Sequence, residues 1–188
     1  MTLVHFILDG LRAMLRGGRG YWIWITLLLG LIALGGAAYV LQLQDGLVVT
    51  GMSDQVSWGF YIANFAFLVG IAAAAVLLVI PAYIFHREDI KSVVLIGEGL
   101  AVAAVIGAML FVFVDLGRPD RALHLLPGFG ILNFPTSLLA WDVVVLNGYL
   151  LLNLAIPFYV HFCHYRGRQP NLKAYFPYIV AGGMIVLA

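Results

Sequence analysis

Long apolar runs alternate with short polar segments along this chain of 188 residues. A bilayer core of about 30 Å needs about 20 helical residues to cross it. The runs of that length predict transmembrane helices near residues 21–41, 58–85, 92–114 and 137–161. A further run at 174–188 begins a fifth span but stops after 15 residues, so we expect the sequence to be a fragment of a longer protein.

These runs predict an all-α polytopic membrane protein. Consecutive spans run in opposite directions, so residues 21–161 should form an antiparallel four-helix transmembrane bundle. Residues 1–20 would then be a cytoplasmic N-terminal segment, 162–173 a cytoplasmic loop and 174–188 a truncated fifth span. The first run could instead be a signal peptide, because it follows basic residues, but its length favours a membrane span.

Composition supports the membrane class. The mean hydropathy is +1.03 and only 10% of the residues are charged, a balance that suits lipid and not a soluble globular domain. The chain has one cysteine, Cys163, which excludes an internal disulfide and an iron–sulfur cluster ligated by this chain alone. We expect no metal site and no nucleic-acid partner.

Basic residues are distributed unequally between the two sides of the predicted bundle. One side would carry Arg118 and Arg121 alone. The side of the N-terminus would carry Arg12, Arg16, Arg19, Arg87, Lys91, Arg166, Arg168 and Lys173. Positive residues concentrate in short cytoplasmic loops, so the N-terminus is predicted to be cytoplasmic.

Polar side chains gather at the predicted outer ends of three spans. Ser57, Tyr61 and Asn64 are spaced i, i+4 and i+7, which places them on one stripe of a helix. Asp115 ends the third span and Asp142 lies in the first turns of the fourth, at the same level. The alternative is an aromatic belt with ordinary surface charges. An interface does not require amides and carboxylates at this depth, so the combination favours a functional site.

Glu98 lies deeper, about two turns from the cytoplasmic end of the third span. An ionisable side chain at mid-membrane costs about 2.5–3.5 kcal/mol on insertion scales, which marks it as a functional candidate. Asp142, Tyr149 and Asn153 share a face of the fourth span, and Asn153 lies at about the depth of Glu98. These groups could form a proton track, or Glu98 and Asn153 could form a hydrogen bond that packs two helices.

Histidines raise the possibility of a haem-bearing cytochrome b. His86, His161 and His164 all fall at predicted cytoplasmic ends of spans, and His124 falls in the outer loop. None lies at the depth of a haem clamped between two helices. Basic residues at the cytoplasmic boundary explain these positions better, although a haem between His86 and His161 stays an alternative.

Three segments carry a resemblance to a known family. Residues 46–74 (GLVVTGMSDQVSWGFYIANFAFLVGIAAA), 114–121 (VDLGRPDR) and 141–153 (WDVVVLNGYLLLN) resemble the integral membrane subunit of the NrfD and polysulfide reductase family. The similarity is strongest to the DsrP branch, found in sulfite-reductase-associated electron-transfer complexes, and to Hmc-type subunits. The resemblance implies eight to ten spans in two four-helix bundles, with no haem in this chain.

The resemblance also implies a function. Such subunits exchange electrons between a quinone, menaquinone or ubiquinone, and a periplasmic iron–sulfur partner of ferredoxin type. Other membrane and cytochrome subunits complete the complex, which lies in the bacterial or archaeal cytoplasmic membrane and serves sulfur or sulfite metabolism.

This function assigns roles to the outer polar cluster. Tyr61 and Asn64 would bind the quinone head group, with Trp58 as an aromatic wall. Arg118 would orient a carboxylate or dock the partner subunit.

Quinol oxidation also releases two protons with two electrons, which requires proton acceptors. Asp115, Asp142 and Glu98 are the proton-relay candidates. A secondary transporter would also show carboxylates within the membrane, but no inverted repeat is visible. A purely structural membrane anchor for a redox partner is the other alternative.

Overall fold

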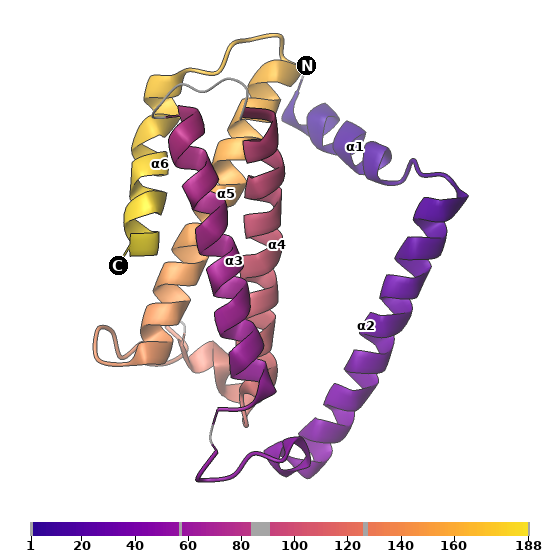
Figure 1. Cartoon of the computed structure of the whole chain (residues 1–188), viewed down its shortest axis with the longest axis vertical. Helices are drawn as coiled ribbons and strands as arrows, with labels where there is room; N and C mark the ends of the chain where they lie inside the picture. The colour runs from indigo at the N-terminus through magenta and orange to yellow at the C-terminus, as the bar shows by residue number, and fades with distance from the viewer. Residues whose placement is uncertain (1, 57, 84–90, 126–127, 188) are drawn as a thin grey trace. The chain divides into compact units, whose positions relative to one another are not determined.

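The computed structural model describes residues 2–56, 58–83, 91–125 and 128–187. Within these ranges the regular secondary structure is helical, and Ser53 and Val56 form an isolated bridge. In chain order the elements are α1 (Leu3–Met14), α2 (Arg19–Asp45), the 3-10 helix η1 (Leu47–Thr50), α3 (Phe60–Tyr83), α4 (Lys91–Asp115), the 3-10 helix η3 (Pro119–Leu125), α5 (Leu138–Tyr165) and α6 (Leu172–Leu187) (Figure 1).

The long helices correspond to the predicted spans. In the described residues, α2, the Ile96–Asp115 part of α4, and α5 are each long and apolar enough to cross a membrane. The described apolar part of α3, Phe60–Ala75, is shorter. The described helices are therefore consistent with the predicted polytopic membrane class. The predicted span at 58–85 extends at its C-terminal end into residues outside the described ranges.

The chain divides into two compact units, which we describe separately. Unit 1 comprises Met1–Ser57 and Phe162–Gln169, and unit 2 comprises Trp58–His161 and Pro170–Ala188. Unit 1 contains α1 and α2, and nearly all side chains of α2 are exposed apart from the buried Gln42. Because α2 is in unit 1, a bundle that contains α2 together with the other spans stays a prediction.

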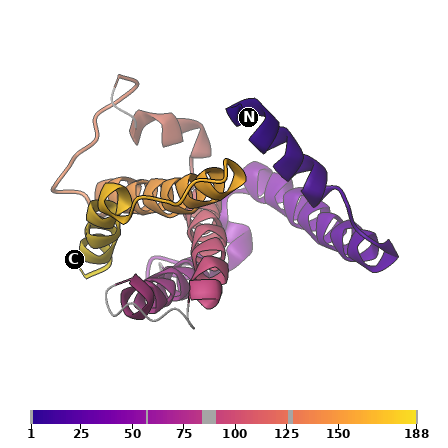
Figure 2. The same cartoon turned by 90° about the horizontal axis from the view of Figure 1, so that it is seen from above.

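In unit 2, successive helices run in opposite directions, and Figure 2 shows them end-on. α3 and α4 approach closely because small residues line their contact: Ala72 and Ala75 face Ala101 and Ala104 in the buried core. A Cβ atom at Gly107 of α4 would lie 3.0 Å from Leu68 Cδ1 of α3, so the close approach extends to this position. Small side chains thus bring these two helices together over several turns.

α5 joins this pair through larger side chains. Leu146 and Tyr149 of α5 complete the core cluster with α3 and α4, and Tyr149 donates a hydrogen bond to the backbone carbonyl of Ala72 at 2.7 Å. A second cluster is formed by Val94 of α4, Ile156 of α5, and Tyr175 and Ile179 of α6. The antiparallel order places the start of α3, the end of α4 and the start of α5 at one end of unit 2 (Figure 1).

The N-terminus of α5 is held by its own preceding loop. The Ser137 side chain accepts a hydrogen bond from the Ala140 N–H at 3.4 Å, and hydroxyl side chains are preferred at such positions because the first helical N–H groups lack backbone partners. Trp141 Nε1 donates to Pro135 O at 2.8 Å, and the Trp141 ring lies 4.6 Å from that of Phe134. These contacts fix the first turns of α5, including Asp142.

Candidate functional site

A cavity of about 140 Å³ opens at the end of unit 2, and Asp142 is the predicted site residue that lines it. It lies between the C-terminal turns of α4, the helix η3 and the N-terminal turns of α5. Its lining residues are Met109, Val112, Phe113, Leu116, Ala122, Leu125, Leu139, Asp142, Val143, Leu146 and Asn147. An apolar wall with a few polar groups is typical of sites for small organic ligands.

Asp142 supplies the charged group in the cavity wall. It lies in the second turn of α5, is half-buried and has no hydrogen-bond partner among the described residues. The other amide or acid in the wall is Asn147, whose Nδ2 donates to the Val143 carbonyl at 2.7 Å within the same helix. Both Asp142 and the Asn147 Oδ1 atom can accept a hydrogen bond from a ligand, and the Asp142 carboxyl can also accept a proton.

Asp115 ends α4 directly before the cavity residue Leu116. Its carboxyl atom Oδ1 is buried and has no hydrogen-bond partner in the described structure. Buried polar atoms in folded proteins nearly always have a partner, so this unpaired carboxyl oxygen is unusual. Asp115 is not among the residues that line the cavity. It is next in sequence to Leu116, which does line the cavity.

The predicted groups on α3 lie beside α4 and not in the cavity wall. The ring of Tyr61 lies 6.3 Å from that of Phe111 on α4. Asn64 Nδ2 donates to the Phe60 carbonyl at 2.8 Å, which leaves Oδ1 without a partner among the described residues. Trp58 is 72% exposed. Ser57 lies outside the described residues. The structure thus separates the α3 groups from the cavity that Asp142 lines.

Arg118 binds the neighbouring Asp120 and neither of the two predicted carboxylates. Its Nε and Nη2 each lie 3.2 Å from one of the two carboxylate oxygens of Asp120, in a two-pronged arrangement on the exposed loop at η3. The hydrogen bonds from Arg118 lower the pKa of Asp120 below its ordinary value, and the same contacts raise the pKa of Arg118. Of the two roles predicted for Arg118, the orientation of Asp115 or Asp142 is absent from the described structure.

Glu98 is buried within the bundle, with 5% of its surface exposed. Its carboxyl interacts electrostatically with the Tyr149 hydroxyl. Asn153 Nδ2 donates to the Tyr149 backbone carbonyl at 2.9 Å, so the predicted hydrogen bond between Glu98 and Asn153 does not form in the described structure. Glu98 and Tyr149 are thus both buried polar residues in an otherwise apolar core.

Several residues of this region were not predicted from the sequence. Phe113 and Leu116 were not identified as cavity walls, because apolar residues at a span end look like any lipid-facing residues. Asn147 was also missed, although an amide within a membrane span is a visible signal. The pairing of Arg118 with Asp120 was open to prediction from their spacing in DLGRPDR.

The described residues contain no group of three or more His, Cys, Asp or Glu side chains able to hold a metal ion. His161 Nδ1 lies 2.8 Å from the Pro157 carbonyl of its own helix. His86, the other half of the alternative haem pair, lies outside the described residues.

The sequence model of the family described as "Polysulphide reductase, NrfD" matches residues 48–179. The chain is 35% identical over 139 residues to a protein of Halobacterium salinarum that is named as a membrane subunit of dimethyl sulfoxide reductase. It is 28% identical over 132 residues to the "Hdr-like menaquinol oxidoreductase integral membrane subunit" of Archaeoglobus fulgidus. It is 26% identical over 102 residues to the "Menaquinone reductase, integral membrane subunit" of Nitratidesulfovibrio vulgaris.

These matches cover 73%, 70% and 54% of this chain, respectively. They cover only 30%, 32% and 24% of the three relatives, so the chain spans about a third of their length or less. No solved structure matches the chain.

Proposed function

The chain belongs to the NrfD family of integral membrane proteins, and from this premise we propose that it is the quinone-interacting membrane subunit of a respiratory electron-transfer complex. Two relatives are named for menaquinol or menaquinone chemistry, which supports a quinone as the substrate. The cavity between α4, η3 and α5 supports a location for it. Menaquinone and ubiquinone both fit the proposal.

The single observation that carries the site is the position of Asp142 in the wall of this cavity. Oxidation of a quinol releases two electrons and two protons, and each hydroxyl proton needs an acceptor as the electrons leave. An apolar wall suits the ring of the quinone, and a carboxyl without a protein partner suits one of its oxygens. In the proposal, Asp142 accepts one proton from the quinol, Asp115 accepts the other, and the two electrons pass to the iron–sulfur partner.

In this proposal, the α3 residues contact the part of the quinone head group that extends out of the cavity. Tyr61 packs against Phe111 of α4, and Asn64 retains an unpaired carbonyl oxygen. A head group that extends from the cavity toward α3 would meet these two side chains, with Trp58 as an aromatic surface beside them. Arg118, which is exposed and paired with Asp120, is assigned to docking of the partner subunit.

Glu98 extends the proton pathway toward the other end of unit 2. It is buried and close to Tyr149, and an ionisable side chain within a membrane bundle is a functional candidate by default. In the proposal, Glu98 and Tyr149 connect the outer carboxylates with the cytoplasmic end of α4. This route would carry protons away from the quinol during its oxidation, and toward the quinone if the complex runs in the direction of quinone reduction.

The assembly and location also belong to the proposal. A periplasmic ferredoxin-like iron–sulfur subunit would receive or supply the electrons, together with other membrane and cytochrome subunits, in sulfur or sulfite metabolism. The N-terminus would be cytoplasmic in a bacterial or archaeal inner membrane. Residues 1–20 would be the cytoplasmic N-terminus, and residues 21–161 would be the first four-span bundle. Residues 162–173 would be a loop, and residues 174–188 would be the start of a second bundle.

The test replaces Asp142 in the full-length protein within its complex. Asp142→Asn keeps the shape of the side chain but removes the proton acceptor, and general acid–base catalysis contributes about 10²–10⁴-fold to reaction rates. We expect menaquinol-dependent electron transfer to fall by about 10²-fold or more. The matched control is Asp54→Asn, which makes the same change at an exposed position outside the cavity.

Binding and turnover distinguish the possible outcomes. A quinone analogue should still bind the Asp142→Asn complex, measured by quenching of its fluorescence, because the cavity is retained. Wild-type turnover in Asp142→Asn would show that the site is misplaced. Absence of saturable quinone binding to the wild-type complex would contradict the quinone function and favour a transporter or a structural anchor.

A further inference from the structure

α1 has two chemically different sides. His5, Asp9 and Arg12 are spaced by four and three residues, so they lie on one narrow stripe of the helix. Most of the remaining circumference is apolar, and its large side chains are between 44% and 69% exposed. They are Leu3, Val4, Ile7, Leu8, Leu11 and Met14. A broad exposed apolar face of this kind requires an apolar medium or partner.

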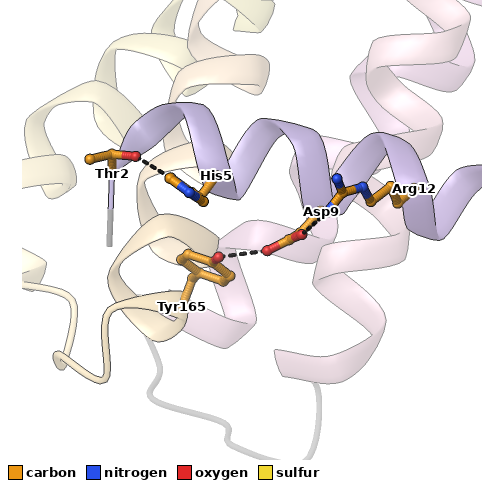
Figure 3. A network of polar contacts seen from close by, with 5 residues as sticks. All are labelled: Thr2, His5, Asp9, Arg12 and Tyr165. Atoms are coloured by element: carbon orange, nitrogen blue, oxygen red, sulfur yellow. Dashed lines mark hydrogen bonds and ion pairs between the residues drawn. The ribbon is translucent and has the colours of Figure 1, made fainter.

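One edge of α1 is attached to the end of α5 within unit 1. The ring of Phe6 makes edge contacts with those of Phe162 and Tyr165, at centroid distances of 5.5 and 5.2 Å. The Tyr165 hydroxyl donates to Asp9 Oδ2 at 2.7 Å, and Arg12 Nη1 donates to Asp9 Oδ1 at 3.4 Å (Figure 3). These contacts use the polar stripe and one aromatic residue. The broad apolar face remains exposed.

The other end of α1 is attached to the start of a membrane span. The Tyr21 hydroxyl of α2 donates to the Met14 carbonyl at 2.8 Å. Gly17 permits this closeness, because a Cβ atom there would collide with the Tyr21 ring. Tyr21, Trp22 and Trp24 form an aromatic group at the beginning of α2, and such groups mark the headgroup level of a bilayer. These aromatic residues would place the C-terminal end of α1 at the level of the membrane interface.

Arginines lie along α1 and at both of its attachments. Arg16 and Arg19 flank the turn between α1 and α2, and Arg12 lies on the polar stripe. The guanidinium of Arg166 lies 5.3 Å from the centre of the Phe162 ring, beside the α1 contact. The acidic group at this place, Asp9, is already bound to Arg12 and Tyr165. The junction therefore has a surplus of positive charge, which favours an anionic surface.

We propose that α1 lies in the plane of the membrane, with its apolar face in the acyl boundary and the arginines on anionic lipid headgroups. Three observations support a lipid surface and not a protein partner. The face continues directly into a membrane span, its connection lies at the aromatic headgroup level, and basic residues surround it. Interfacial helices of this composition bury their apolar face about 5–10 Å into the boundary.

The test uses the full-length protein in lipid vesicles, with Cys163→Ser as background because Cys163 is the only cysteine of this chain. Spin labels are attached to Val4→Cys, Ile7→Cys and Leu11→Cys on the apolar face. His5→Cys and Arg12→Cys on the polar stripe serve as matched controls on the same helix. Collisions with oxygen report lipid, and collisions with a water-soluble nickel complex report water.

The expected result is an alternation with helical period. Oxygen should dominate at the three apolar positions, at a depth of about 5–10 Å, and nickel at the two polar positions. Arg16→Gln with Arg19→Gln should make the labels shallower in vesicles that contain phosphatidylglycerol and leave them unchanged in pure phosphatidylcholine. Nickel dominance at all positions would overturn the proposal. Protection of the apolar positions from both reagents would also overturn it, because it indicates a protein partner.

Discussion

Tyr149 shows how a single side chain can connect elements within a membrane bundle. Its hydroxyl donates a hydrogen bond to the backbone of α3, and its own backbone carbonyl accepts a hydrogen bond from the side-chain amide of Asn153. Only 3% of its surface is exposed. A hydroxyl buried in an apolar bundle needs such a partner, because no water is available to replace it.

Tyr149→Phe tests this connection. The substitution removes the hydrogen bond to Ala72 and leaves the ring, and interhelical hydrogen bonds in membranes contribute about 0.6 kcal/mol on average. We expect the free energy of unfolding in detergent to fall by about 0.6–1.7 kcal/mol. Tyr178→Phe, at a position that is 55% exposed on α6, is the control and should cause no measurable change. Equal stability of the two variants would contradict a role for the hydroxyl.

Asp120 predicts a pH dependence on the loop at η3. Its pKa is lowered in the folded protein, mainly by hydrogen bonds from Arg118, so its stabilising contribution is present above its ordinary value of 3.8. The contribution is lost as the pH falls below 3.8 and through the lower folded pKa. The protection factors of the η3 loop amides, which compare the measured exchange rates with the intrinsic rates at the same pH, should therefore fall in acid.

The variant Asp120→Asn provides the comparison for this pH dependence. Its loop should exchange faster than wild type near neutral pH and lack the acid-dependent step. The pair is exposed, so added salt should reduce the difference between the two proteins. An unchanged acid step in Asp120→Asn would assign the dependence to another group.

At the scale of elements, the contact between α3 and α4 depends on small residues. Buried alanines and Gly107 allow the two backbones to approach, as is typical of helix pairs in membranes. The lengths of the apolar runs predicted these helices to within a few residues. Which helices pack against each other was not predictable. Alanine and glycine occur on every face of an apolar span, so the pattern does not show which face contacts another helix.

Two glycines of α4 offer a matched test of the contact. Gly107→Leu introduces a side chain against Leu68, whereas a Cβ atom at Gly99 would meet no atom within 4 Å. Overpacking typically costs about 1–3 kcal/mol, so Gly107→Leu should lower the free energy of unfolding by that amount. Gly99→Leu should leave it unchanged or raise it slightly. Thermal unfolding of both variants in the same detergent measures the difference.

α1 was not predicted as a separate element. From its basic residues, the segment 1–20 was predicted only as a cytoplasmic N-terminal segment. The separation of apolar and polar side chains onto two faces becomes visible only when residues 3–14 are placed on a helix. The candidate site was predicted in part: the level of Asp142 followed from the antiparallel order of the spans. The cavity itself depends on how η3 folds against α4 and α5, which no local pattern of apolar residues specifies.

At the scale of the whole molecule, the distribution of arginine and lysine predicts which side of the membrane each loop occupies. The predicted topology would place α1 and the end of α5, which are in contact within unit 1, on the same side of the membrane.

Cysteine labelling tests the predicted topology. In the Cys163→Ser background, Phe129→Cys in the loop before α5 should react with a membrane-impermeant maleimide added outside intact cells. Gln169→Cys, in the loop before α6, should react only after the membrane is opened. Both native residues are exposed, so accessibility to solvent is matched. The reverse pattern would place the N-terminus outside.

The hydrogen bond between Tyr165 and Asp9 also determines an order of assembly during synthesis. The two residues are 156 positions apart, and every span from α2 to α5 lies between them. At synthesis rates of about 5–20 residues per second, Asp9 leaves the ribosome roughly 10–30 s before Tyr165 exists. The contact can therefore close only after the fourth span has been made, so its formation marks a chain whose insertion has proceeded through α5.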